Sequence, residues 1–508
     1  MSYSTMNTSQ KRVYTSVLTL SAGAARKLFL DHPWYSDLDL PAAYDFTPLL
    51  RAVSTHMGNK HFSSFCASDP KSVGSAMNYT HEHSRGGGKS RSYCFLNPVL
   101  YVSLVHELTR PDNWDALRTV VRHLSDDSRI FSGSLPTVPE PEHSLRATNV
   151  RRWFHLVEQR SISATMRYPY LATTDIENFY PSIQPSILRS LADRREFPHF
   201  DNGILRGFYD MIEQHVALMG CGQDSGLPVG CPLMELISEL LLAYIDQSLV
   251  TYIDDLARAH KNILDVQIIR YRDDYRIHCD SFGVAALIIE RLKEELDKVG
   301  LKLSDEKTRF HEDPVTGAVK PDKIASLMLP TQGTLLAKLQ CLHAHSLLHP
   351  NSGSVVKGLT MALTHIDDSG YYGNAEPIAA VICDIMAKNP RSYPVGCALL
   401  SRILTPEQFG SVGSSLRGKV RLTEHSSLFD VWFQRLAISK EFTLIESDSM
   451  LVQLEFGKID SLWDTSWLAP PLADIVRNTR IVQCATSTNG CAIPAKEVCL
   501  FPPKHRRN

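Results

Sequence analysis

Two adjacent aspartates, Asp273 and Asp274, lie between two short apolar runs, and this arrangement constrains the fold of the chain more than any other feature. The runs are residues 266–270 (VQIIR) and 275–279 (YRIHC), and the tetrad Tyr271-Arg272-Asp273-Asp274 joins them. Apolar runs on both sides of a short polar connection predict a β-hairpin with both carboxylates at its tip. Adjacent carboxylates repel each other and are costly to desolvate, so such a tip favours a bound divalent cation. We therefore expect a third carboxylate elsewhere in the chain.

The third carboxylate is predicted to be Asp175, within residues 170–183 (YLATTDIENFYPSI). Residues 170–174 have the composition of a buried strand, and Asp175 comes where that strand should end. Phosphoryl transfer uses two oxygen-ligated metal ions, one at the attacking oxygen and one at the leaving group. Asp175 and Asp273 on neighbouring strands could bridge both ions, with Asp274 as a weaker or outer ligand.

Two further segments accompany these acids in a fixed order. Between them, residues 226–230 (GLPVG) predict a turn whose backbone can approach a nucleotide or base pair, and a long buried helix follows. After the hairpin, residues 300–310 (GLKLSDEKTRF) place Lys307 in a strand or loop. A lysine in that position could neutralise or protonate a departing pyrophosphate.

The composition describes a globular protein of two or three domains. The chain has 508 residues, of which 43% are hydrophobic and 21% are charged, and its net charge is −2. This balance excludes general disorder and a uniformly basic nucleic-acid binder, although Arg85, Lys89 and Arg91 form a local basic cluster. The eleven cysteines show no CxxC pair, so we expect reduced thiols and no structural zinc. No segment is expected to cross a membrane, and we expect a cytoplasmic protein.

The order DIxxFYPSI, GLPxG, YxDD and GLxLSxEKT resembles the palm of reverse transcriptases over residues 170 to 310. The fuller forms NFYPSI and ISELLLAYID are most similar to the bacterial abortive-infection and defence-associated reverse transcriptases. Upstream, KSRSYCFLNPVLYVSLVHEL is similar to the fingers segment of that family. The resemblance implies an α+β fold with right-hand fingers and palm and a mostly α-helical C-terminal domain. The expected divisions are an N-terminal helical extension (1–60), fingers (61–165), palm (166–325) and helical C-terminal domain (326–508), with helical repeats as one form of the last.

The resemblance also implies residue roles. Asp175, Asp273 and Asp274 would be the catalytic acids on two Mg2+ ions, with Mn2+ as the alternative, and the Ile176 carbonyl would be a further metal ligand. Tyr180, next to Phe179, would be the aromatic gate that disfavours a ribose 2'-hydroxyl. The residues expected to contact the incoming nucleotide or templating pair are Gly226, Pro228, Val229 and Gly230, with Lys89 and Arg91 on the triphosphate and Lys307 on the pyrophosphate.

Three departures from the family pattern bear on how a primer is held. Val229 replaces a frequent glutamine, Met234 replaces a frequent serine, and no primer-grip motif follows Arg309 and Phe310. These departures keep three functions open. The first is RNA-directed DNA synthesis in antiphage defence from dNTPs, with a noncoding RNA, a single-stranded DNA product and a trimeric or hexameric assembly as implied partners. The second is template-independent or protein-primed synthesis of low-complexity DNA, and the third is a non-catalytic nucleic-acid scaffold.

Several other patterns are interpreted as structural. A second tetrad, Tyr252-Ile253-Asp254-Asp255, continues a helical pattern, so its acids are expected to face solvent. GGGKS at 86–90 lacks the first glycine of a phosphate loop, because that position is His83. The triplet His81-Glu82-His83 is interpreted as a polar loop, Trp463 and Trp467 as core residues, and FPPKHRRN at the end as a basic tail.

Overall fold

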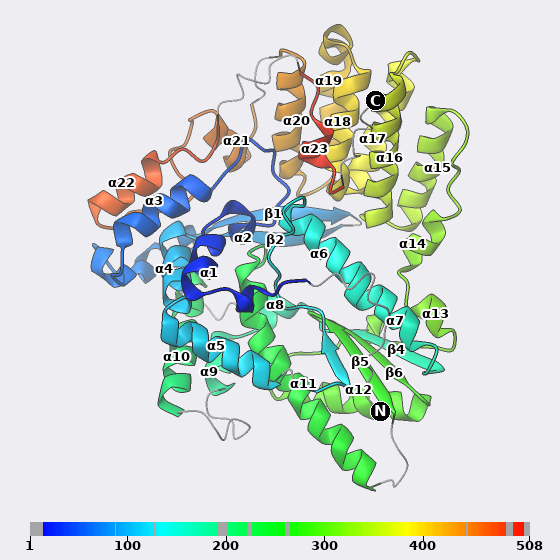
Figure 1. Ribbon diagram of the computed structural model, residues 1–508. Coiled ribbons are helices and arrows are strands. Elements are labelled where there is room, and N and C mark those ends of the chain that lie inside the picture. The colour runs from blue at the N-terminus through cyan, green and yellow to red at the C-terminus, as the bar shows by residue number, and fades with distance from the viewer. Residues whose placement is uncertain are drawn as a thin grey trace.

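The computed structural model describes residues 14–86, 88–124, 127–191, 202–220, 226–259, 265–442, 446–483 and 491–501. The predicted basic tail lies, apart from Phe501, outside these ranges. The elements group into an N-terminal helical region, a β-hairpin with two helices, a five-stranded sheet with its helices, and a C-terminal helical region (Figure 1). One continuous hydrophobic core runs through all four.

The N-terminal region and the first hairpin precede the sheet. The N-terminal elements are η1 (Val17–Thr19), α1 (Ala22–Phe29), α2 (His32–Tyr35), α3 (Thr47–Met57), η2 (Phe62–Phe65) and η3 (Pro70–Met77). The antiparallel hairpin β1 (Tyr79–Gly86) and β2 (Lys89–Phe95) follows, and then come α4 (Pro98–Leu108) and α5 (Pro111–Leu124). Strand β2 and helix α4 make up the segment that resembles the fingers. The interpretation of His81 and His83 as part of a polar loop is wrong, because both are buried in β1.

The central sheet has the strand order β3-β5-β6-β4-β7. Its strands are β3 (Ile130–Ser132), β4 (Tyr170–Asp175), β5 (Val266–Tyr271), β6 (Asp274–Cys279) and β7 (Arg309–His311). Only the β3–β5 pair is parallel; the other neighbours are antiparallel. The predicted hairpin over residues 266–279 and the buried strand that ends at Asp175 are both confirmed. The sheet also includes β3, which lies in residues 61–165, the region expected to form the fingers.

Helices cover the sheet and fill the space beside it (Figure 1). They are α6 (Leu145–Trp153), the π-helical turn η4 (Phe154–Glu158), α7 (Gln159–Ala164), α8 (Phe179–Ser182), α9 (Pro185–Ser190), α10 (Asn202–Met219), α11 (Leu233–Ala259), α12 (Phe282–Asp297), η6 (Asp305–Lys307), α13 (Pro314–Gly317) and α14 (Pro321–Ser326). Helix α12 packs on β4 and β6. The π turn η4 packs on β5, α7 packs on β5 and β6, and α13 packs on β4.

Helix α11 is the long buried helix predicted after GLPVG. By length and composition, Leu233–Arg258 could cross a membrane, so the expectation that no segment reaches that length was wrong. In the fold 78% of this apolar stretch is buried, as in the core helix of a globular protein. The second tetrad lies on α11 as predicted, and Asp254 and Asp255 pair at its surface with Arg129 and Arg258.

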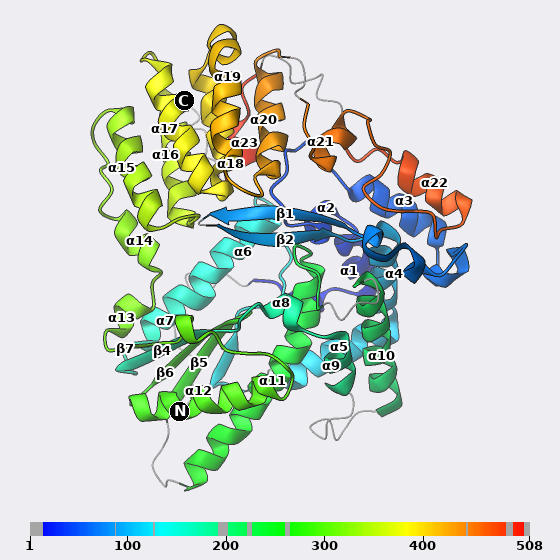
Figure 2. The same cartoon turned by 180° about the vertical axis from the view of Figure 1, so that it is seen from behind.

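The C-terminal region is helical throughout its described elements. These are α15 (Leu335–Leu348), α16 (Gly353–Ser369), α17 (Ala375–Lys388), η7 (Pro390–Ser392), α18 (Tyr393–Ile403), α19 (Pro406–Arg421), α20 (Ser427–Ser439), α21 (Met450–Glu455), α22 (Pro470–Asn478) and α23 (Ala495–Val498). Trp463 and Trp467 are buried, which confirms their interpretation as core residues. The β1–β2 hairpin lies between this helical region and the sheet (Figure 2). The predicted fold class, α+β with a mostly helical C-terminal part, is confirmed.

Candidate active site

Strand pairing brings the three predicted acids together at one end of the sheet. Asp175 ends β4 and lies directly opposite Asp274, the first residue of β6. Asp273 occupies the two-residue connection between β5 and β6, and its carbonyl accepts a hydrogen bond from the Ile176 N–H at 3.1 Å. Directly opposed residues of antiparallel strands project from the same face, so the carboxylates of Asp175 and Asp274 share a face beside the tip.

The electrostatics of the site show that negative charge is concentrated there. Burial, followed by the neighbouring carboxylates of Asp175 and Asp274, raises the pKa of Asp273 to about 6, against the partial effect of Arg272. Burial also raises the pKa of Asp274. Lys307 Nζ lies 2.6 Å from Asp175 Oδ1, and Arg276 Nε lies 3.7 Å from Asp274 Oδ1. Lys307 is in the short helical turn η6, and its partner is Asp175, one of the predicted catalytic acids.

Arg272 holds the hairpin tip in an unusual backbone conformation. Its φ is +56°, a region that side chains other than glycine rarely adopt and that costs on the order of 1–3 kcal/mol. The Arg272 N–H donates to Ser134 Oγ at 2.6 Å, and its guanidinium forms an ion pair with Glu235 of α11. Contacts from two other elements therefore fix the connection that carries Asp273.

A second buried arginine anchors the base of the same hairpin. Arg270 is fully buried and pairs with Glu239 at 2.8 and 3.0 Å and with Asp246 at 2.8 Å, both from α11. Glu235, Glu239 and Asp246 are spaced by four and seven residues, which places them along one side of the helix. The sequence predicted α11 only as an apolar helix, although this acidic spacing within an apolar run could have indicated a charged partner for it.

The GLPVG turn packs against the segment that carries Tyr180. The Leu227 N–H donates to the Tyr180 carbonyl at 2.8 Å, and a Cβ atom on Gly226 would lie 2.3 Å from the Pro181 carbonyl oxygen. Only glycine fits at position 226. Tyr180 is half-buried, and its hydroxyl has no hydrogen-bond partner among the described residues. Phe179 is 4% exposed, so its side chain supports this segment from the core.

The other end of the turn meets the β1–β2 hairpin and the N-terminal region. The Val229 carbonyl accepts from the Cys94 N–H at 2.8 Å, and the Gly230 carbonyl accepts from the Asp37 N–H at 2.9 Å. A Cβ atom on Gly230, whose φ is +94°, would lie 2.7 Å from the Tyr93 ring. Pro228 is half-buried within the same turn. The sequence had assigned no chemistry to residues 1–60, yet Asp37 lies beside the predicted nucleotide contact.

The hairpin's basic residues lie at different distances from the acids. Burial and the neighbouring Arg91 lower the pKa of Arg85, whereas Tyr93, Asp175 and Asp273 raise it, so Arg85 lies within electrostatic reach of two acids. Arg91 is exposed and pairs across the hairpin with His83. Lys89 is exposed at the outer end of β2, and no hydrogen bond or ion pair joins it to the acids among the described residues. Arg85, which the sequence placed only in the basic cluster, is therefore the basic residue of the hairpin with a direct electrostatic link to the acids.

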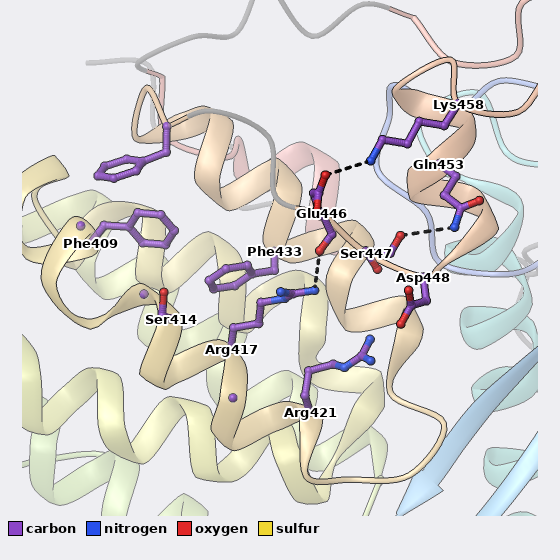
Figure 3. Close-up of a pocket in the computed structure, with 14 residues that line it drawn as sticks. Phe409, Ser414, Arg417, Arg421, Phe433, Glu446, Ser447, Asp448, Gln453 and Lys458 are labelled. Atoms are coloured by element: carbon purple, nitrogen blue, oxygen red, sulfur yellow. Dashed lines mark hydrogen bonds and ion pairs between the residues drawn. The ribbon is translucent and has the colours of Figure 1, made fainter.

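A cavity of about 680 Å³ lies away from these residues, in the C-terminal helical region (Figure 3). Its lining includes Phe409, Arg417 and Arg421 of α19 and Phe433 of α20, and none of the predicted site residues. Both arginines bind the buried carboxylate of Asp430, at 3.0 and 2.7 Å. The single carboxylate of Asp430 offsets one of these two charges. The cavity contains none of the three acids, so the candidate active site remains at the end of the sheet.

Paired carboxylates at the end of a mainly antiparallel sheet are an arrangement that suits metal-dependent nucleotidyl transfer. A comparison with protein-family models matches part of the chain. Residues 116–324, which include the whole five-stranded sheet, match the family model "Reverse transcriptase (RNA-dependent DNA polymerase)". The chain thus carries a region that matches the reverse transcriptase domain, a family described as RNA-dependent DNA polymerases.

The solved structures to which the chain shows similarity include two fungal telomerases. One is telomerase from Candida albicans in complex with a fragment of telomeric RNA, at 12% identity and a TM-score of 0.26, covering 60% of this chain and 56% of that one. The other is apo telomerase from Candida tropicalis, at 11% identity and a TM-score of 0.31, covering 79% of this chain and 72% of that one. The chain thus spans little more than half the length of the first structure. No curated protein sequence matches the chain significantly.

Proposed function

We propose that this protein is a magnesium-dependent reverse transcriptase that acts in antiphage defence and synthesises DNA from dNTPs on a noncoding RNA template. The observation that carries the polymerase assignment is the register of β4 against β6, which sets Asp175 opposite Asp274 with Asp273 at the adjoining tip. The defence role is supported by the resemblance of NFYPSI and ISELLLAYID to the abortive-infection group. On the basis of the same resemblance we propose an assembly into trimers or hexamers, and we also propose that the protein is cytoplasmic.

The residues at the site suit magnesium. Among the residues that the structure describes, no three His, Cys, Asp or Glu side chains are arranged as a ready metal cluster. Mg2+ is commonly held by one or two carboxylates and completed by water and substrate phosphates, so Asp175, Asp273 and the Ile176 carbonyl form a suitable oxygen donor set. Burial and then the carboxylate of Asp175 raise the pKa of Asp273, and a bound cation would favour its ionised form. Bound metal ions would activate the attacking 3'-hydroxyl and stabilise the leaving pyrophosphate.

The remaining groups have roles that follow from their positions. Tyr180 lies beside Gly226 and near Asp273, where an aromatic ring can exclude a 2'-hydroxyl from the sugar pocket. Arg85 and Arg91 can bind the triphosphate, because arginine forms bidentate contacts with phosphate oxygens. The contact of Lys307 with Asp175 supports a role beside the acids, in which its ammonium donates a proton to the departing pyrophosphate.

The decisive experiment is incorporation of labelled dNTPs by the purified chain with both hairpin acids replaced, Asp273→Asn and Asp274→Asn. We expect incorporation to fall to background. The matched control is Asp254→Asn with Asp255→Asn, which makes the same change in the second tetrad on α11 and should leave incorporation unchanged. Wild-type incorporation by the hairpin double variant would contradict the assignment of the active site.

Two measurements address the finer parts of the proposal. Sequencing the nucleic acid that co-purifies from the native host should recover a defined RNA and a complementary DNA; low-complexity DNA without a template would instead favour template-independent or protein-primed synthesis. Phage plating on cells that express the protein should show protection that the hairpin double variant abolishes. Protection retained by that variant would favour a non-catalytic scaffold.

A further inference from the structure

The helix that runs from residue 145 to residue 164 contains a π-helical turn beside the candidate active site. Helix α6 ends at Trp153, the π turn η4 covers Phe154–Glu158, and α7 continues from Gln159. Single π-helical turns are rare and occur frequently at functional sites. This one sets two consecutive aromatic residues, Trp153 and Phe154, at its start, and Phe154 is 37% exposed.

Three cations surround the Trp153 ring. Lys320 Nζ lies 4.7 Å, Lys323 Nζ 5.0 Å and Arg276 Cζ 5.5 Å from the ring centroid. Lys323 also lies 5.1 Å from the Phe154 ring, and the buried carboxylate of Glu158 holds it at 2.9 Å. Lys320 is exposed, and within the described part of the chain it has no carboxylate at ion-pair distance. We call Trp153, Phe154, Lys320 and Lys323 the aromatic–lysine platform.

The platform is connected to the catalytic acids through the sheet. Arg276 is two residues from Asp274 on β6, so the two side chains project from the same face, and Arg276 Nε lies 3.7 Å from Asp274 Oδ1. Thr173 of β4 pairs with Arg276 on one side and with Arg309 of β7 on the other, which places Arg309 on this face as well. Helices α7 and α13 lie next to the sheet, and α14 follows toward the C-terminal helices, where it packs on α16 (Figure 2).

The cations near this face outnumber their carboxylate partners. Lys307 pairs with Asp175, Lys323 pairs with Glu158, and Arg276 lies near Asp274. Lys320 and the exposed Arg309 have no such partner among the described residues. Clustered cations attract the phosphodiester backbone, and exposed aromatic rings interleaved with them stack on unpaired bases.

We propose that the aromatic–lysine platform binds a single-stranded nucleic-acid segment whose 3' end reaches Asp274. The inference rests on the proposed polymerase function, because that function makes this the strand that is extended. No primer-grip motif follows Arg309 and Phe310. In its place, two segments that flank the palm would hold the primer strand: the π turn and the residues that begin α14. Lys320 contacts a phosphate and Phe154 stacks on a base.

The test measures binding separately from synthesis. A fluorescein-labelled oligodeoxythymidine is titrated with the purified full chain in EDTA, without dNTPs, and its anisotropy gives Kd at several salt concentrations. Lys320→Glu should raise Kd about fivefold to thirtyfold and reduce the salt dependence by about one phosphate contact. Lys320→Arg keeps the positive charge and should have the same Kd as the wild type. Phe154→Ala, a change of a partly exposed side chain, should raise Kd about fivefold or more through lost stacking.

Lys60→Glu is the matched control, because it makes the same charge change at an exposed lysine of the N-terminal region and should leave Kd unchanged. Unchanged oligonucleotide binding in both Lys320→Glu and Phe154→Ala would overturn the proposal. A raised KM for dNTPs with an unaltered oligonucleotide Kd would also overturn it, since it would place the platform on the nucleotide. If the chain made no DNA but these variants still lost binding, the polymerase assignment would fail and the binding surface would remain.

Discussion

Replacing Asp273 by asparagine should stabilise the metal-free protein at neutral pH, although it removes a predicted metal ligand. Burial and the adjacent carboxylates raise the pKa of Asp273 from its ordinary 3.8 to about 6. Since the folded state binds this proton more tightly than the unfolded state, ionisation of Asp273 lowers the free energy of unfolding as the pH rises from about 4 to about 6. Above that range the whole destabilising contribution is present, and below about 4 it is absent.

The size of the effect follows from the shift. A change of about two pKa units corresponds to at most about 3 kcal/mol, and solvent screening at this partly exposed tip reduces it to about 1–2 kcal/mol. For a chain of this size the Asp273→Asn variant should melt roughly 1–3 °C above the wild type at pH 7.5 in EDTA. The difference should shrink at pH 5. Added Mg2+ should stabilise the wild type and have little effect on the variant.

Differential scanning fluorimetry across pH, with and without Mg2+, measures both effects. Asp255→Asn is the matched control, because it makes the same substitution in the second tetrad, where the carboxylate is 62% exposed, and it should change the melting temperature little. An Asp273→Asn variant that melts below the wild type in EDTA at pH 7.5 would refute the reasoning. So would a difference that is the same at both pH values.

Three further outcomes are expected. Arg270→Met should cost about 3–5 kcal/mol of stability, because it leaves two buried carboxylates of α11 without their partner, and denaturant titration would detect the loss. Tyr180→Ala should increase incorporation of ribonucleotides relative to deoxyribonucleotides in single-nucleotide extension, whereas Tyr180→Phe should preserve the wild-type ratio, since the hydroxyl has no hydrogen-bond partner among the described residues. Gly226→Ala should reduce polymerisation strongly, because the added Cβ would lie 2.3 Å from a carbonyl oxygen. The control is Gly58→Ala, which has open space around the new Cβ although its φ is positive, and it should leave polymerisation unchanged. Equal activity of the two variants would count against a tight turn at Gly226.

Much of the local structure was predictable because its signals are short-range. The apolar runs on both sides of Asp273 and Asp274 predicted the hairpin, and the apolar run after GLPVG predicted α11. The helical spacing around Asp254 excluded the second tetrad, which lies on the surface of α11. Lys307 was predicted near the pyrophosphate, but its pairing with Asp175 could not be read from the chain, because the two residues are 132 positions apart.

The sequence by itself determined that this protein has a hairpin bearing two acids, a strand ending in a third, and a glycine turn between them in that order. These features depend on residue type and periodicity, which act over a few neighbours. Only the tertiary structure decided what surrounds the acids: Asp37 beside Gly230, Glu235 on Arg272, and Lys320 over Trp153. Each of these contacts joins segments that no local pattern relates, and they exist because packing around one core brings distant elements together.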